Sequence, residues 1–195
     1  MLAGLPALLV AFGLVVAQQP SAPAPSASTT GALPAPTTID AQTDATRAEW
    51  DLKISHMVRR GELKLTKETP SEDGTRREEW FVQLHKGVPV VGTEVWRESE
   101  KNKAVAIEGV LFTGIVLNPV PKLTREEALA AFVALANGGP GPSLTPVLVV
   151  LPQPAGKFVL VYQARVFTGT DLTLYSIDGS TGAVVQADRE MGASR

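Results

Sequence analysis

The sequence predicts an α+β fold of two small modules, in each of which a helix packs on an antiparallel β-sheet. Two stretches with helically spaced apolar residues each precede a group of short strands bounded by turn residues. Charged side chains also become sparser along the chain, from 13 basic and 14 acidic residues in 40–122 to 5 and 6 in 123–195. This change places a junction between the modules near Pro119 and Pro121.

The first 42 residues are expected to lie outside both modules. Residues 1–17 carry no charge and form an apolar run ending in small residues, which predicts a cleaved signal peptide and a secreted or periplasmic protein. An uncleaved anchor or an unrelated apolar tail are the alternatives, but Pro6 and the short length disfavour a stable membrane span. Residues 18–42 are largely Pro, Ala, Ser and Thr, which predicts a disordered tether.

Composition bounds the classes of partner. The net charge is −2 with both signs interleaved, which offers no field of one sign to nucleic acid or to an anionic membrane. We therefore expect neither as a partner. Cysteine is absent, so disulfides and thiolate metal ligands do not contribute and the core alone must hold the fold.

The first module is expected over residues 43–118. Apolar side chains at helical spacing predict a helix from Thr43 to Arg60 that stops at Gly61, although the alternation of Trp50, Leu52 and Ile54 also fits a strand. An antiparallel meander should follow, with a turn at Pro70–Gly74 and a charged, exposed connection at Glu98–Lys103. Its strands are expected at Glu62–Thr69, Arg76–His85, Val90–Arg97 and Ala104–Phe112.

The second module is expected over residues 119–188, followed by a tail at 189–195. Thr124 and Glu127 form a capping box, which predicts a helix over Arg125–Asn137 ended by Gly138. A rigid turn region is expected at Gly139–Pro142, and a hairpin turn at Asp178–Gly182. Strands are expected at Thr145–Leu151, Lys157–Phe167, Leu172–Ile177 and Ala183–Gln186.

One segment of the first module resembles a known family. Residues Trp80–Gly92 read W-F-V-Q-L-H-K-G-V-P-V-V-G, a hairpin pattern that turns at Lys86-Gly87. The string resembles the Q-x-x-x-G-h-P-V-h-G core (h, apolar) of the fungalysin/thermolysin propeptide (FTP) domain. Trp80 departs from that family, which commonly has arginine there. The matching positions are Gln83, Gly87, Val88, Pro89, Val90 and Gly92.

The second module looks like the PepSY domain. In that family an apolar strand ending in proline precedes an L-x-Y-x-h strand, and a D-A-x-T-G-x-V hairpin closes the sheet. Here the first strand ends at Pro152, and Gly179 replaces the usual alanine of the hairpin. The two resemblances together cover about residues 45–188, in the family's order. The positions matching the strand and the hairpin are Tyr162, Asp178, Thr181, Gly182 and Val184.

The sequence contains no recognisable catalytic pattern. A thermolysin-type zinc site needs two histidines one helical turn apart and a neighbouring glutamate. The chain has only His56 and His85, on different predicted elements, and no G-x-S-x-G turn. We therefore expect no enzyme, no metal and no cofactor. Gln83 is interpreted as a buried amide that pins the sheet, while Pro89 and Gly92 shape the backbone.

The resemblance implies a secreted, non-catalytic propeptide-like protein. Such a protein would bind a thermolysin- or fungalysin-type zinc metalloprotease as inhibitor and folding helper, and would act in trans if it is free-standing. Two alternatives stay open. The chain could be the amino-terminal fragment of an interrupted protease precursor with no independent role. It could also be an envelope-associated module that binds other proteins through an exposed sheet edge.

Overall fold

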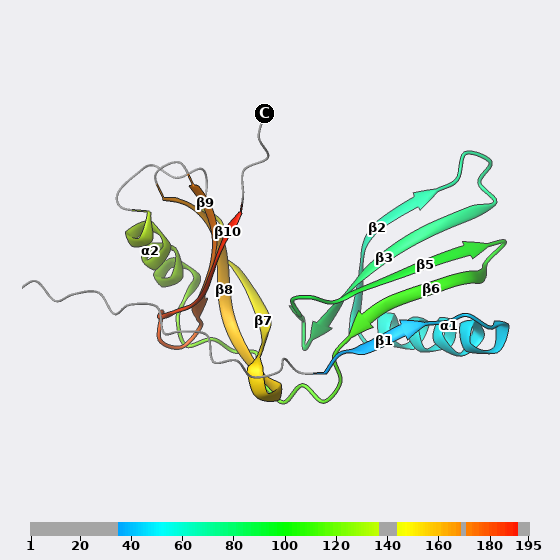
Figure 1. Cartoon of the computed structure of the whole chain (residues 1–195), viewed down its shortest axis with the longest axis horizontal. Helices are drawn as coiled ribbons and strands as arrows, with labels where there is room; N and C mark the ends of the chain where they lie inside the picture. Colours follow the sequence, from blue (N-terminus) through cyan, green and yellow to red (C-terminus); the bar gives the residue numbers. More distant parts are fainter. Residues whose placement is uncertain (1–34, 137–143, 169–170, 191–195) are drawn as a thin grey trace, which may run out of the picture.

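The computed structural model describes residues 35–136, 144–168 and 171–190. Within these ranges it confirms the α+β class, with two α-helices and two antiparallel sheets (Figure 1). The first sheet has the strand order β1-β6-β5-β3-β2, with β4 paired to β3, and the second has the order β10-β9-β8-β7. The elements are β1 (Thr37–Asp40), α1 (Asp44–Arg59), β2 (Leu63–Pro70), β3 (Arg76–His85), β4 (Val88–Pro89), β5 (Glu94–Glu100), β6 (Lys103–Leu111), α2 (Arg125–Leu135), β7 (Val147–Gln153), a short 3₁₀ turn (Pro154–Gly156), β8 (Lys157–Thr168), β9 (Asp171–Asp178) and β10 (Val184–Glu190).

The stretch around Trp50, which the sequence allowed as a helix or a strand, forms helix α1. Thr43 is its N-cap and forms a capping box with Thr46, which satisfies backbone donors that the first turn leaves free. Ile54, on the face toward the sheet, is fully buried among Phe81, Val95 and other core residues. A local cap and one apolar face therefore select the helix over the strand.

Strand β1 corrects the tether expected over residues 18–42. Thr37–Asp40 pairs antiparallel with β6, and Ile39 is only 2% exposed in the core under α1. One buried isoleucine and a ladder of backbone hydrogen bonds offset the weak strand propensity of the flanking residues. Residues 1–34, which hold the expected signal peptide and most of the tether, lie outside the described ranges.

The connection expected at Glu98–Lys103 is also corrected. Strand β5 runs to Glu100 and β6 starts at Lys103, so only Lys101 and Asn102 form the turn, with φ of 49° and 66°. Positive φ at both positions is typical of a type I′ hairpin turn. Glu98 and Glu100 lie within the ladders to β3 and β6, and both also pair with Arg76 of β3.

The capping box predicted for α2 is present. The Thr124 backbone N–H donates to Glu127 Oε2 at 2.7 Å, and the Glu127 N–H donates to Thr124 Oγ1 at 3.2 Å. Phe132 and Ala128 are fully buried against the second sheet, where they contact residues of β8 and β9. The helix reaches Leu135, and the expected stop at Gly138 and turn at Gly139–Pro142 lie outside the described residues.

The two sheets lie side by side and touch where β4 meets β7 (Figure 1). Val90, just after β4, forms a parallel bridge with Val150 of β7, and the Val91 N–H donates to the Val150 carbonyl at 2.9 Å. An apolar cluster surrounds this bridge and includes Val88, Phe112 and Leu160. The hairpin at Trp80–Gly92 thus belongs to the first sheet and contacts the second.

Candidate functional site

The hairpin singled out in the sequence turns where predicted. Lys86 and Gly87 have φ of 50° and 90°, and His85 pairs with Val88 across this two-residue turn. Gly87 meets this backbone demand without a side-chain penalty. Gly92, predicted to permit a bulge, also has a positive φ of 77° and ends the segment before β5.

Gln83 is the polar centre of this hairpin. Its side chain is 8% exposed, and its Nε2 donates to the Phe112 carbonyl at 2.7 Å while its Oε1 accepts from the Phe112 N–H at 2.8 Å. The Gln83 carbonyl accepts from Val90 at 2.9 Å, and its own N–H donates to the Thr93 hydroxyl at 3.2 Å. The amide therefore holds the residue that follows β6, not a neighbouring strand of the ladder.

The valines of the motif reach the second sheet. Val88 and Val90, 9% and 1% exposed, pack with Val150 and Leu160 of that sheet. Pro89 pairs with Leu84 in the short β3–β4 ladder, at the border of the first sheet, as expected for a proline. Apolar burial and one backbone hydrogen bond thus join the two sheets at this hairpin.

The connection from Phe112 to Leu123 is held at several points. The His85 ring Nε2 lies 2.9 Å from the Leu117 carbonyl, which can accept a hydrogen bond from the imidazole. At the far end, the Leu123 N–H donates to the Gly179 carbonyl at 2.9 Å. The Tyr162 hydroxyl donates to the Leu123 carbonyl at 3.0 Å. His85 of the first-sheet hairpin, and Tyr162 and Gly179 of the second unit, therefore hold this connection in place.

The Tyr162 hydroxyl lies in the second core near the start of α2. Burial raises the pKa of this hydroxyl above its ordinary value, and the negative charge of Glu126 adds to that effect. Tyr162 therefore stays a neutral donor to the Leu123 carbonyl at physiological pH. Its role is structural, because it orients the first turn of α2.

The D-G-S-T-G segment forms a turn organised by Asp178. Asp178 Oδ1 accepts from the backbone N–H groups of Ser180 and Thr181, both at 2.8 Å, and from the Thr181 hydroxyl at 3.1 Å. This is the local side-chain to backbone bonding that favours aspartate in turns. Gly182 has a φ of 74°, and Val184, the last matched position, is 43% exposed at the start of β10.

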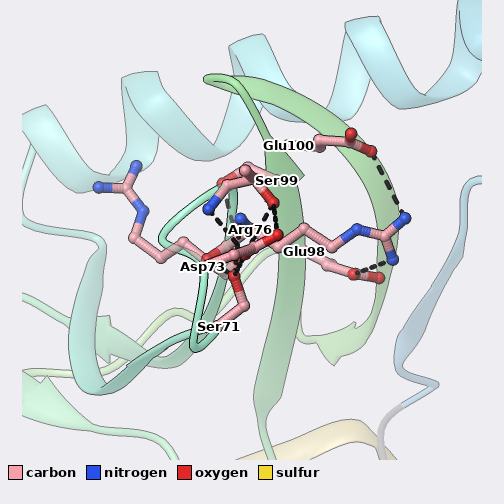
Figure 2. Close-up of polar contacts among 8 residues, drawn as sticks. Ser71, Asp73, Arg76, Glu98, Ser99 and Glu100 are labelled. Atoms are coloured by element: carbon pink, nitrogen blue, oxygen red, sulfur yellow. Dashed lines mark hydrogen bonds and ion pairs between the residues drawn. The ribbon is translucent and has the colours of Figure 1, made fainter.

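A second polar group lies in the β2–β3 turn and the adjoining strand ends (Figure 2). Asp73 accepts from the Ser71 hydroxyl at 2.6 Å and from the backbone N–H of Thr75 at 3.0 Å. These hydrogen bonds lower the pKa of Asp73 from 3.8 to about 2, and the bond from the Ser71 hydroxyl has the largest effect. Figure 2 also shows Arg76 reaching the carboxylates of Glu98 and Glu100, at 3.1 and 3.5 Å.

A partly buried ion-pair network joins α1 to the first sheet. Arg97 Nη2 lies 2.6 Å from Glu79 Oε2, and its Nη1 lies 2.8 Å from Asp51 of α1. Glu79 is only 6% exposed, and its other carboxylate oxygen lies 3.8 Å from Arg77 Nε, so two guanidinium groups face this buried side chain. The guanidinium also lies 5.5 Å from the Phe81 ring centroid. The network stabilises the packing of α1 against the first sheet.

The two histidines do not meet. His56 lies on α1 and His85 at the end of β3, where it contacts the Leu117 carbonyl. Within residues 35–136, 144–168 and 171–190, no three His, Asp or Glu side chains gather into a group able to hold a metal ion. Across the same residues, no helix is both long and apolar enough to cross a bilayer.

Sequence reasoning missed the residues that complete the junction. Backbone groups of Phe112 and Leu117 bond to the side chains of Gln83 and His85. The Val150 carbonyl accepts a hydrogen bond from the Val91 N–H of the hairpin segment. Their contribution is made by main-chain atoms or by apolar packing, which leaves no polar pattern in the sequence. The apolar run around Val150 was the available signal, and it was interpreted as a strand of the PepSY-like module without a contact to the first sheet.

No protein-family model matches the chain, and no curated protein matches it. Among solved structures, the chain is similar to the Bacillus megaterium YpeB C-terminal domain, with a TM-score of 0.39 and 14% sequence identity. The similarity covers 77% of this chain and 66% of that one, so the chain spans slightly less than two thirds of its neighbour's length.

Proposed function

We propose that this chain is a secreted, non-catalytic propeptide-like protein that binds a thermolysin- or fungalysin-type zinc metalloprotease as inhibitor and folding helper. The observation that carries the proposal is the form of the two matched segments. The Gln83–Gly92 segment is a hairpin in the first sheet, and Asp178–Val184 is an Asp-centred turn in the second. Each belongs to an α+β unit, in the order of the FTP and PepSY pair.

The assignment of the first unit, expected at 43–118, to an FTP-like module and of the second, expected at 119–188, to a PepSY-like module is part of this proposal; β1 adds Thr37–Asp40 to the first sheet, and β10 extends the second to Glu190. Support comes from the hydrogen bonds of the matched residues. Gln83 binds Phe112, just after the first sheet, while Tyr162 binds Leu123, just before α2. Both matched segments thus stabilise the same connection, which gives them a common physical role in keeping the two units together.

We also propose that the protein acts by binding alone. The chain has two histidines, His56 and His85, and they lie on α1 and β3. A thermolysin-type site requires both histidines on one helix, at i and i+4, with a glutamate beside the first. Inhibition would then depend on a surface that covers the partner's cleft, with no bond formed or broken in this chain.

The experiment is a titration of the purified full chain against a thermolysin-like zinc protease acting on a small peptide substrate. The proposal predicts saturable inhibition at or below about 1 μM, together with a higher yield of active protease when the denatured enzyme is refolded with the chain. A trypsin-like serine protease is the matched control and should stay active. Absence of inhibition at micromolar concentration, together with no gain in refolding, would contradict the proposal.

A further inference from the structure

The face of the first sheet opposite α1 carries a shallow hollow of about 450 Å³. Glu94 pairs with Val110, and Trp96 pairs with Glu108, across the antiparallel strands β5 and β6. Alternation along each strand places these four side chains on one face, while Val95 points into the core under α1. The hollow is therefore bordered by one aromatic ring and two carboxylates.

The three tryptophans of the chain differ in what covers them. Lys53 Nζ lies 4.6 Å from the Trp50 ring centroid, and Lys67 Nζ lies 4.2 Å from that of Trp80. Trp80 is the cross-strand neighbour of Trp96 on the same sheet face. No Lys or Arg of the described ranges stacks on Trp96, although tryptophan is the aromatic side chain that attracts cations most strongly.

The carboxylates beside Trp96 also differ from their neighbours. Glu98 and Glu100, further along β5, both pair with Arg76. Glu94 and Glu108 are exposed, and neither forms an ion pair with any residue in the part of the chain that the structure describes. The hollow thus combines an aromatic ring without a cation and two negative charges without a counter-charge.

We propose that this hollow binds the guanidinium group of an arginine presented by the partner polypeptide. A planar guanidinium stacks on Trp96 while its N–H groups donate in pairs to the carboxylate of Glu94 or Glu108. A lysine ammonium would satisfy the charge but neither the stacking nor the paired donation, so arginine is the preferred occupant. The inference deepens the proposed function by naming one contact that the partner makes.

The test uses the full ¹⁵N-labelled chain and acetyl-arginine-amide as the probe, and follows the three indole N–H signals by NMR. Trp96→Phe identifies the Trp96 signal. We expect a saturable shift of that signal with the arginine compound, little shift with the uncharged citrulline analogue, and a weaker response to acetyl-lysine-amide. The Trp50 and Trp80 signals should stay in place.

Charge variants show which side chains bind the probe. Glu94→Gln and Glu108→Gln should each weaken the apparent affinity about two- to fivefold, the range of an exposed ion pair. Glu78→Gln is the matched control, because Glu78 lies on the same face of the sheet and outside the hollow, and should leave the affinity unchanged. Unaltered Trp50 and Trp80 signals in each variant spectrum without probe confirm that the fold is intact, because Glu94 and Glu108 lie beside Trp96 and their replacement shifts its signal directly.

Three outcomes would overturn the inference. They are no saturable shift of the Trp96 signal up to about 0.1 M probe, equal shifts with arginine and citrulline compounds, or equal weakening by Glu78→Gln and Glu94→Gln. The protease is absent from this experiment, so its result is independent of the inhibition assay. If the chain binds the arginine compound but inhibits no zinc protease, the proposed function is refuted and the arginine-binding role of the hollow still stands.

Discussion

Replacing Gln83 with methionine tests how the first sheet holds the connection to the second. Methionine has nearly the same length and shape, so packing is largely kept while both hydrogen bonds to Phe112 are lost. The Phe112 N–H and carbonyl would then be buried without partners, because Phe112 itself is only 8% exposed. The variant isolates the polar contribution of the amide.

The magnitude follows from these two bonds. A buried backbone group left without a partner costs about 1–3 kcal/mol, so losing the partners of both should lower the free energy of unfolding by about 2–6 kcal/mol. Domains of ordinary stability have about 5–15 kcal/mol in total. With a urea m-value of about 2 kcal/mol/M, the unfolding midpoint should fall by about 1–3 M.

The assay is urea unfolding followed by tryptophan fluorescence. All three tryptophans belong to α1 or to the first sheet, so the signal reports on the part of the molecule that contains Gln83. Gln42→Met is the matched control, since Gln42 is exposed next to β1 of the first sheet and its side chain donates to Asp40, two residues away. A midpoint shift for Gln83→Met no larger than that of the control would refute the role assigned to Gln83.

Three further predictions concern other parts of the two modules. Arg97→Met should lower the free energy of unfolding by about 3 kcal/mol in the same assay, because Glu79 loses its short ion pair and keeps only the longer contact of 3.8 Å with Arg77; a loss below about 1 kcal/mol would contradict this. Tyr162→Phe removes the bond to Leu123 and should cost about 1 kcal/mol, seen as a melting temperature lower by about 2–4 °C, whereas an unchanged value would show that the bond is not stabilising. The carboxyl of Asp73 should titrate by NMR with a midpoint near pH 2. Because its folded pKa lies below its unfolded value, its stabilisation of the turn is complete above about pH 4 and is lost as the pH falls through 2. A measured midpoint near 3.8 would rule out the hydrogen bonds assigned to this carboxyl.

Local signals predicted much of the fold. The capping box at Thr124 and the turn at Lys86-Gly87 are short-range patterns in which a few neighbouring residues satisfy backbone donors or supply positive φ. Both occur at the predicted positions. The helix at α1 was ambiguous by periodicity, and burial of Ile54 against the sheet decided it.

The rest depended on partners far along the chain. β1 follows a stretch rich in Pro, Ala, Ser and Thr, and becomes a strand because β6, about 70 residues later in sequence, supplies its hydrogen bonds. The short turn after Glu100 depends on the pairing of β5 with β6 up to Glu100 and Lys103 and on positive φ at Lys101 and Asn102. Gln83 was expected to pin the sheet, but its partner Phe112 lies 29 residues further along the chain, just after β6. The apolar periodicity of a strand does not indicate so distant a contact.

Direct binding to a zinc protease tests the central claim most simply. Calorimetric titration of the full chain into a thermolysin-like protease should give a saturable one-to-one complex with a Kd at or below about 1 μM. The same titration into a trypsin-like serine protease should give no binding heat. A zinc protease that forms no complex with the chain at concentrations of about 50 μM would contradict the account.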